Sequence, residues 1–187
     1  MRFCLDVFAN KVYDPGLHRQ RVFFDKHYHS MIDLYSYGHD IESSWLIDWG
    51  THLLGDKELI SKIEAIDADL AKAIYENAYD NHSIANECER GKVDETRVWW
   101  VQAEAVLGFV NLWQKSGVPR YKDAAADVLR FIEEKMVDRR QGGEWFWCLD
   151  AQGNPIPGKP IVEPWKCPYH NGRMCLELIR RDPDIYV

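Results

Sequence analysis

Ser36-Tyr37-Gly38-His39-Asp40-Ile41-Glu42-Ser43-Ser44-Trp45 is the stretch around which the rest of the chain is organised. A turn at Gly38 leads into a helix, and Asp40 favours the positive N-terminal end of that helix. At helical spacing one face carries His39, Glu42, Ser43, Leu46, Trp49 and Leu53. A carboxylate one turn from an imidazole can orient it and set its proton affinity. The stretch indicates an acid–base pair above an apolar stripe, with a structural capping pair as the alternative.

A second histidine begins a helix in Glu163-Pro164-Trp165-Lys166-Cys167-Pro168-Tyr169-His170-Asn171-Gly172-Arg173. Pro168 suits the first turn of this helix. Taken alone, His170 is equally explained as a hydrogen-bonding residue at a helix start. Two histidines that each open a helix nevertheless favour one shared site.

The composition favours one soluble globular domain over residues 1–187. The chain is 46% hydrophobic and 28% charged, which allows a sizeable core. The net charge of −7 without a basic cluster argues against a nucleic-acid partner. No apolar run approaches the roughly 20 residues that cross a bilayer, so no membrane partner is expected.

The start of the chain and its cysteines favour a cytoplasmic protein. Asp6, Asn10 and Lys11 interrupt the apolar start, which therefore does not resemble a signal peptide. The 5 cysteines show no CxxC spacing, and we expect free, mostly buried thiols. His27 and His29 have a metal-ligand spacing but no matching ligands nearby, so no metal site is predicted.

The 8 tryptophans are many for this length. Several lie beside turns or polar residues: Trp99, Trp100, Trp145, Trp147 and Trp165. Aromatic faces pack well on the apolar faces of sugar rings, so carbohydrate is a reasonable ligand class. The alternative is that these side chains only fill a core.

The spacing of apolar residues predicts a mainly α fold. The expected helices cover about 2–13, 39–54, 57–79, 96–116, 119–137 and 168–181. The expected extended runs cover 20–25, 28–35 and 142–150. About six helices, mostly in consecutive antiparallel pairs with short β hairpins in the connections, indicate a helical repeat array. There is no βαβ alternation, phosphate loop or GxSxG motif.

Five motifs in order carry a resemblance to a known family: SYGHDIESSWL, NECERGKV, WWVQAE, GGEWFW and EPWKCPYHNGR. From about Phe3 to Arg180 the chain resembles the C-terminal half of the cellobiose 2-epimerases, in the N-acylglucosamine 2-epimerase superfamily. The resemblance implies the second half of an (α/α)6 barrel, two concentric rings of helices with a pocket at one end. It also implies inversion of C2 in a reducing-end glucose, without a metal or nucleotide cofactor. Similar motifs occur in enzymes that act on monosaccharides.

The resemblance also implies roles for individual residues. His39 and His170 match the two acid–base histidines, and Glu42 matches the carboxylate that supports the first of them. Further matches are an aromatic residue that packs on the sugar, Trp165, and the pocket-lining positions Trp99, Trp100 and Glu104. Arg173, one turn after His170, could stabilise a developing oxyanion or form a structural pair.

The chemistry fits two histidines. Inverting C2 beside an opened aldehyde removes a proton from one face and returns one to the other through an enediolate. Imidazole titrates near neutrality, so each ring can act as base in one direction and acid in the other. An aldose–ketose isomerase or an N-acylglucosamine 2-epimerase would use the same intermediate.

Two other classes of function and one assembly question stay open. A glycoside hydrolase would need two opposed carboxylates, with Glu42 and Glu163 as the candidates. A noncatalytic sugar-binding half-barrel module is the third reading. Half a barrel leaves apolar helix faces without neighbours, so we expect a homo-oligomer or pairing with a separate N-terminal half.

Overall fold

The computed structural model describes residues 1–181 and residue 185. Its six α-helices are α1 (Arg2–Val7), α2 (Tyr37–Leu54), α3 (Lys57–Asn77), α4 (Trp99–Ser116), α5 (Pro119–Phe131) and α6 (His170–Arg181). The mainly α prediction is confirmed, and α2 to α6 begin within a few residues of the expected positions. The first and fifth helices end earlier than expected in α-form, because each continues as a short π-helical segment, at Phe8–Val12 and Ile132–Met136.

The strands are short and all pair antiparallel. The two-stranded pairs are β1 (Tyr13–Asp14) with β2 (Arg19–Gln20), β4 (Tyr79–Asp80) with β5 (Ser83–Ile84), and β8 (Arg97–Val98) with β9 (Cys148–Leu149). A three-stranded sheet has the order β3 (Leu34–Ser36), β6 (Glu87–Glu89), β7 (Lys92–Asp94). The extended run expected at 142–150 is paired as a strand only in β9, since Gly143 closes a turn onto the carbonyl of Arg140. In the runs expected at 20–25 and 28–35, Gln20 belongs to β2, Leu34 and Tyr35 belong to β3, and a single bridge joins Phe24 to Ser30.

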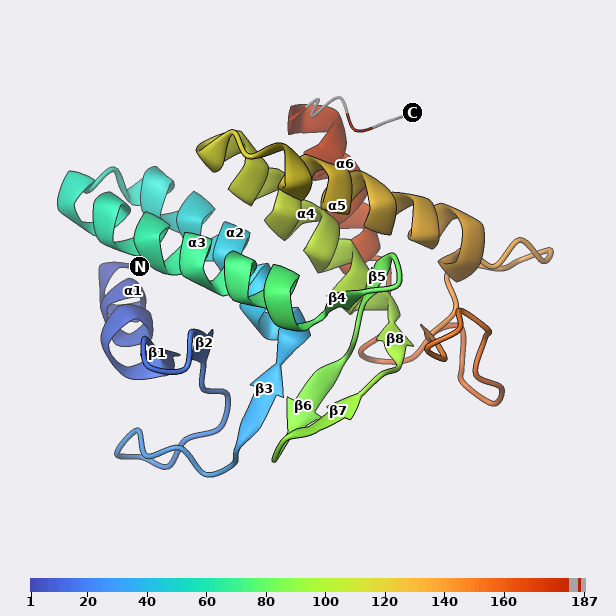
Figure 1. Ribbon diagram of the computed structural model, residues 1–187, viewed down its shortest axis with the longest axis horizontal. Coiled ribbons are helices and arrows are strands. Elements are labelled where there is room, and N and C mark those ends of the chain that lie inside the picture. The colour runs from blue at the N-terminus through green and yellow to red at the C-terminus, as the bar shows by residue number, and fades with distance from the viewer. Residues whose placement is uncertain (182–184, 186–187) are drawn as a thin grey trace.

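The helices form two layers, with α3 and α5 in front of α2, α4 and α6 (Figure 1). Helix α4 is the centre and packs against α2, α5 and α6. It is buried from Val101 to Leu112, because most of these residues are apolar and the polar ones, Gln102, Glu104 and Asn111, have partners inside the protein. Strands β3 and β8 lead directly into α2 and α4, so the β hairpins gather where these helices begin (Figure 1). None of the described helices is both long and apolar enough to cross a bilayer.

Helices α2 and α4 approach each other closely at Gly108. A Cβ on Gly108 would lie 2.5 Å from Cδ1 of Ile41 and 3.0 Å from the Ile41 carbonyl oxygen. Because backbone as well as side chain opposes it, the contact cannot be relieved by a rotamer change alone. This close approach brings the beginnings of the two helices side by side.

Gly108→Ala is expected to destabilise the chain by about 1–3 kcal/mol through overpacking. The matched control is Gly50→Ala in α2, where the nearest atom to a new Cβ, Sδ of Met1, lies 4.0 Å away. There we expect about 0.5–1 kcal/mol of stabilisation from helix propensity. Urea unfolding followed by circular dichroism measures both changes. Equal free energies of unfolding for the two variants would contradict the close packing of α2 on α4.

Two apolar helix faces are exposed. The face on α6 consists of Leu176 and Ile179, and the face on α2 consists of Trp49 and Leu53. The α2 residues are those that helical spacing placed on the face of His39. A contiguous apolar face of this kind favours association with another protein surface.

The expectation of mostly buried thiols is wrong. All five cysteines are free, but Cys4, Cys167 and Cys175 are exposed, and only Cys148 is buried. Cys175 is exposed because it shares the outward face of α6 with Leu176 and Ile179.

Candidate active site

The first residues of α2, α4 and α6 meet at one place, although they are far apart in the sequence. The imidazole ring of His39 lies 5.0 Å from the ring of Trp100, between centroids. The ring of His170 lies 5.3 Å from the same indole. The two histidines therefore contact one tryptophan at the end of the helices where the β hairpins gather. The prediction that two helix openings share one site agrees with this geometry.

Ser36, at the N-cap position of α2, is the hydrogen-bonding partner of His39. Its Oγ lies 2.6 Å from Nδ1 of His39, and it makes no capping bond to the helix backbone. A hydroxyl both donates and accepts, so Ser36 can bind either tautomer of the neutral imidazole. Burial, and then the charge of His170, lower the pKa of His39. This ring is therefore held in its neutral form at neutral pH.

The prediction that Glu42 orients His39 is wrong. Among the described residues, Glu42 is bonded to Arg173, whose guanidinium donates to Oε1 over 2.6 Å, and it lies 3.8 Å from Nδ1 of His170. The reason is that α2 and α6 both pack on α4, so that Arg173 of α6 reaches across to this carboxylate, which three-residue spacing along α2 cannot reveal. Glu42 thus belongs to the surroundings of the second histidine.

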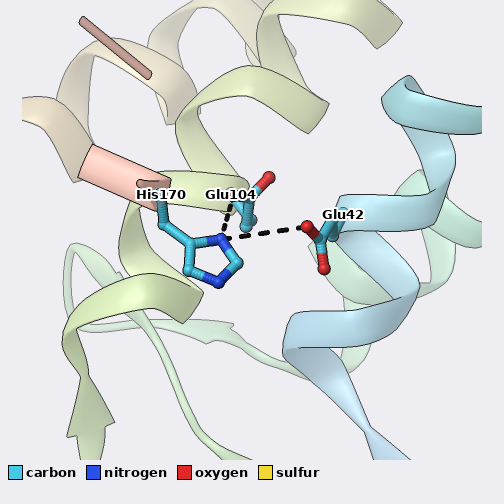
Figure 2. Close-up of side chains that lie close together, drawn as sticks. All are labelled: Glu42, Glu104 and His170. Carbon is cyan, nitrogen blue, oxygen red and sulfur yellow. Dashed lines mark hydrogen bonds and ion pairs between the residues drawn. The ribbon is translucent and has the colours of Figure 1, made fainter. Parts of the chain in front are cut away.

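His170 is buried and is fixed by Glu104 of α4. Nδ1 of His170 lies 2.6 Å from Oε1 of Glu104, so this nitrogen carries the proton that the carboxylate accepts. Figure 2 shows the other ring nitrogen, Nε2, pointing away from both Glu104 and Glu42. Nε2 is thereby the ring nitrogen that can exchange a proton with a ligand. The ring of Trp99 packs edge-on against His170 at 5.4 Å and limits its rotation.

Glu104 is the centre of this network. It is 0% exposed, and its Oε1 also accepts from Arg173 over 2.7 Å. Its Oε2 accepts from Nε1 of Trp45 over 2.8 Å. Burial, and then the charge of Glu104, raise the pKa of Glu42, and these effects outweigh the opposing hydrogen bond from Arg173. Two carboxylates this close repel each other, and the guanidinium of Arg173 between them offsets that repulsion.

One carboxylate oxygen each of Glu42 and Glu104 and one ring nitrogen of His170 lie within 4.8 Å of one another, a spacing that metal ligands also have. The dashed contacts in Figure 2 join these three side chains. The guanidinium of Arg173 donates to both carboxylates, so a cation of the protein already occupies the position between them. The three side chains therefore form an ion-pair network around Arg173 and His170, and this network explains their close spacing without a metal.

Three residues predicted to contact a sugar lie in different settings. Trp165 is 78% exposed on the turn before α6, with no ring contact that fixes it. Trp99 is 1% exposed and forms the floor beneath His170, so it has no free face for a ligand. Glu104 lies below the surface because its position is one turn deeper along α4 than Trp100. The pocket-lining expectation is therefore corrected for Trp99 and Glu104, which support the site from beneath.

Sequence reasoning missed the residues that hold the turn before α6. Lys166 is buried, forms an ion pair with Glu144, and lies 5.0 Å above the ring of Trp99. Asn171 donates to the same Glu144. A lysine inside an aromatic, cysteine- and proline-rich motif was the available signal, because a buried ammonium group requires a carboxylate.

The carboxylate pair that a glycoside hydrolase would need is not available. Glu42 is in its ion pair with Arg173, and Glu163 accepts from Nε1 of Trp147 over 2.9 Å. Each of the two carboxylates therefore already has a partner on the protein.

Comparison with known proteins gives one consistent family. Residues 16–171 match the family model of N-acylglucosamine 2-epimerase (GlcNAc 2-epimerase). A cellobiose 2-epimerase from Eubacterium cellulosolvens is 49% identical over 97% of this chain. One from Dictyoglomus turgidum is 46% identical over 94% of it.

Solved structures agree with the sequence comparison. A crystal structure of a sugar epimerase from a ruminal bacterium superposes with a TM-score of 0.94, at 42% identity over 96% of this chain. The cellobiose 2-epimerase of Bacillus thermoamylovorans gives a TM-score of 0.89, at 43% identity over 95% of this chain.

The chain spans about half the length of these relatives. It covers 44% of the Eubacterium enzyme and 46% of the ruminal epimerase chain. Its helices therefore correspond to half of an (α/α)6 barrel, as the sequence motifs indicated. With the family model matched over most of its length, the chain belongs to the N-acylglucosamine 2-epimerase family.

Proposed function

We propose that this chain carries the acid–base groups of a sugar 2-epimerase, which inverts C2 of a reducing-end glucose in a disaccharide such as cellobiose. The single observation that carries the proposal is that the rings of His39 and His170 both lie within 5.3 Å of the same indole, that of Trp100. Its support from comparison is the set of cellobiose 2-epimerases at 37% to 49% identity.

The proposed reaction is a pair of proton transfers on the opened sugar. One imidazole removes the proton from C2, and the electrons of the C–H bond pass into the carbonyl to form an enediolate. The other imidazole, in its protonated form, returns a proton to the opposite face of C2. The aldehyde is regenerated and C2 is inverted, while the histidines exchange roles in the reverse direction. Proton transfer alone balances this reaction, so no cofactor is required.

The surrounding residues have supporting roles in this proposal. Glu104 holds His170 so that Nε2 faces the sugar, and Ser36 does the same for His39. Trp165, exposed beside His170, is available to pack on a sugar ring. Arg173 serves mainly to neutralise Glu42 and Glu104. The substrate-binding role predicted for Arg173 is therefore secondary to the structural one.

We further propose that the active form includes a second protein surface against α2 and α6. The exposed apolar residues Trp49, Leu53, Leu176 and Ile179 support this. In the longer relatives the remaining part of the barrel is available to cover such faces. Either a second copy of this chain or a separate polypeptide equivalent to that part would do so here.

The experiment is proton NMR of cellobiose in D₂O with the 187-residue chain. It is done with the chain alone and with the part of the Eubacterium cellulosolvens enzyme that this chain does not match. Appearance of the epimer with mannose at the reducing end, with deuterium at C2, supports the proposal. A ketose product would instead indicate an isomerase that reprotonates the enediolate at C1. Binding of cellobiose without C2 exchange in either arm would indicate a noncatalytic module.

The pH dependence follows from the lowered pKa of His39, which is caused by burial and then by the charge of His170. A base must be neutral to accept a proton, so protonation of His39 ends catalysis in the direction in which it is the base. The acid limb of the kcat/KM profile for that direction is therefore expected to lie below the ordinary histidine value of about 6.5. Initial rates of C2 exchange from pH 4 to 8 measure it. An acid limb centred above that value would contradict the assignment of His39.

A further inference from the structure

A cavity lies between α2, α3 and α4, and none of the residues of the candidate active site lines it. Its volume is about 370 Å³, at the lower end of the sizes found for small-molecule sites. It is lined by Ser44 of α2, by α3 residues from Glu64 to Lys72, and by α4 residues from Gly108 to Ser116. The α4 residues belong to its C-terminal half, whereas the histidines meet at its N-terminal end.

The carboxylate of Asp67 lines this cavity without a partner. The residue is 2% exposed, and neither Oδ1 nor Oδ2 has a hydrogen bond within the described residues. Burial, and then the charge of Asp48, raise its pKa well above the ordinary value. A buried polar group without a partner is costly, and in native proteins such groups usually bind a ligand or water. Asp67 is therefore the feature that makes this cavity a candidate site.

The neighbouring charges already pair with one another. Nζ of Lys115 lies 2.8 Å from Oδ1 of Asp48 and 2.5 Å from Oε1 of Glu64. His52 lies 3.0 Å from the same Glu64 oxygen. Asp48, His52 and Glu64 have the spacing of metal ligands, but the Lys115 ammonium group occupies their centre. A divalent metal would have to expel it, so a metal is disfavoured there.

The unpaired carboxyl group and the walls define the ligand. Asp48 and Glu64 pair with Lys115, whereas Asp67 has no hydrogen-bond partner among the described residues, so Asp67 is the group to which a cation could still bind. The other walls include the apolar side chains of Ala65, Ala68, Ala71 and Leu112. An alkyl chain fits these walls better than a hydrated ion does, because it buries apolar surface against them.

We propose that this cavity binds a small organic cation, a primary alkylammonium, whose charged group pairs with Asp67 and whose chain packs along the alanine and leucine walls. The ammonium group supplies a positive charge beside Asp67 and up to three donors to its oxygens. This binding is independent of the sugar chemistry, because the two sites share no residue.

The test is a titration of the full chain with n-butylammonium chloride, followed by NMR chemical shifts. For one ion pair and four carbons we expect saturation with a dissociation constant on the order of 1 mM. Asp67→Asn keeps the side-chain shape and removes the charge, and should weaken binding at least about tenfold. The matched control is Asp123→Asn, the same change at an exposed position of α5, which should leave binding unchanged. Ala68→Leu fills the cavity and should abolish binding even if Asp67→Asn alters the fold.

Three results would overturn the proposal. The first is absence of saturation with n-butylammonium in the unmodified chain, which would indicate that water satisfies Asp67. The second is equal affinity in the Asp67→Asn and Asp123→Asn variants. The third is saturation by potassium or magnesium chloride in place of the amine, which would make the cavity an inorganic cation site.

Discussion

Replacing His170 with alanine is expected to lower the rate of C2 inversion by about 10²- to 10⁴-fold, the usual contribution of one general acid–base group. The variant keeps Glu104 and Arg173 but has no group to exchange a proton with one face of the sugar. Loss should fall mainly on kcat, because Trp100 and Trp165 are left in place to bind the substrate. His39→Ala should give a loss of the same order. The measurement is incorporation of deuterium at C2 of cellobiose by proton NMR, under the conditions in which the unmodified chain is active.

The matched control for this prediction is His82→Ala. His82 is an exposed histidine whose Nδ1 is bonded to Asp127, away from the site. The His82→Ala variant should retain full activity. If His170→Ala kept the circular dichroism of the parent chain and more than about a tenth of its rate, an acid–base role for His170 would be excluded.

Arg173→Met is expected to destabilise the chain by about 3–5 kcal/mol, the usual cost of removing one partner from a buried ion pair. The change leaves Glu104, which is 0% exposed, and Glu42 without their shared cation. Methionine keeps much of the length of the arginine side chain, so the loss reports charge more than packing. Urea unfolding at neutral pH measures it. The loss should shrink on acidification, because protonation neutralises Glu42, whose pKa is raised by burial and then by the charge of Glu104.

Two further variants separate electrostatics from packing at this site. Arg180→Ala removes an exposed cation that pairs with Glu177 on the same helix, and should cost less than about 1 kcal/mol. The double variant Arg173→Met with Glu104→Gln removes a charge of each sign and should recover part of the lost stability. If the double variant were no more stable than Arg173→Met alone, the charge on Glu104 would not be the cause.

The helices could be predicted from the sequence because they depend on local patterns. Apolar residues at helical spacing placed α2 to α6, and Gly55 and Gly117 ended α2 and α4, both with positive φ. The short strands were harder to place. Their pairing joins segments distant in the sequence, as β3 with β6 and β8 with β9, and no local pattern specifies such partners.

The candidate site was predicted in part. His39 and His170 could be singled out because each opens a helix within a motif. The partner of each histidine could not be read from spacing alone. Ser36 binds His39 through a turn, and Glu104 reaches His170 across 66 residues of sequence. Local spacing favoured Glu42 for His39, whereas the packing of α2 and α6 on α4 brought Glu42 to Arg173.

The sequence by itself therefore determined the helical architecture and the two histidines, because periodicity, helix-start residues and motifs are local properties of the chain. Only the tertiary structure decided which side chain orients each histidine, and that Trp99 lies beneath the site. It alone also placed Asp67 in a cavity without a partner. These features depend on which helix faces pack together, and side chains far apart in sequence come into contact only when the core between α2, α4 and α6 is formed.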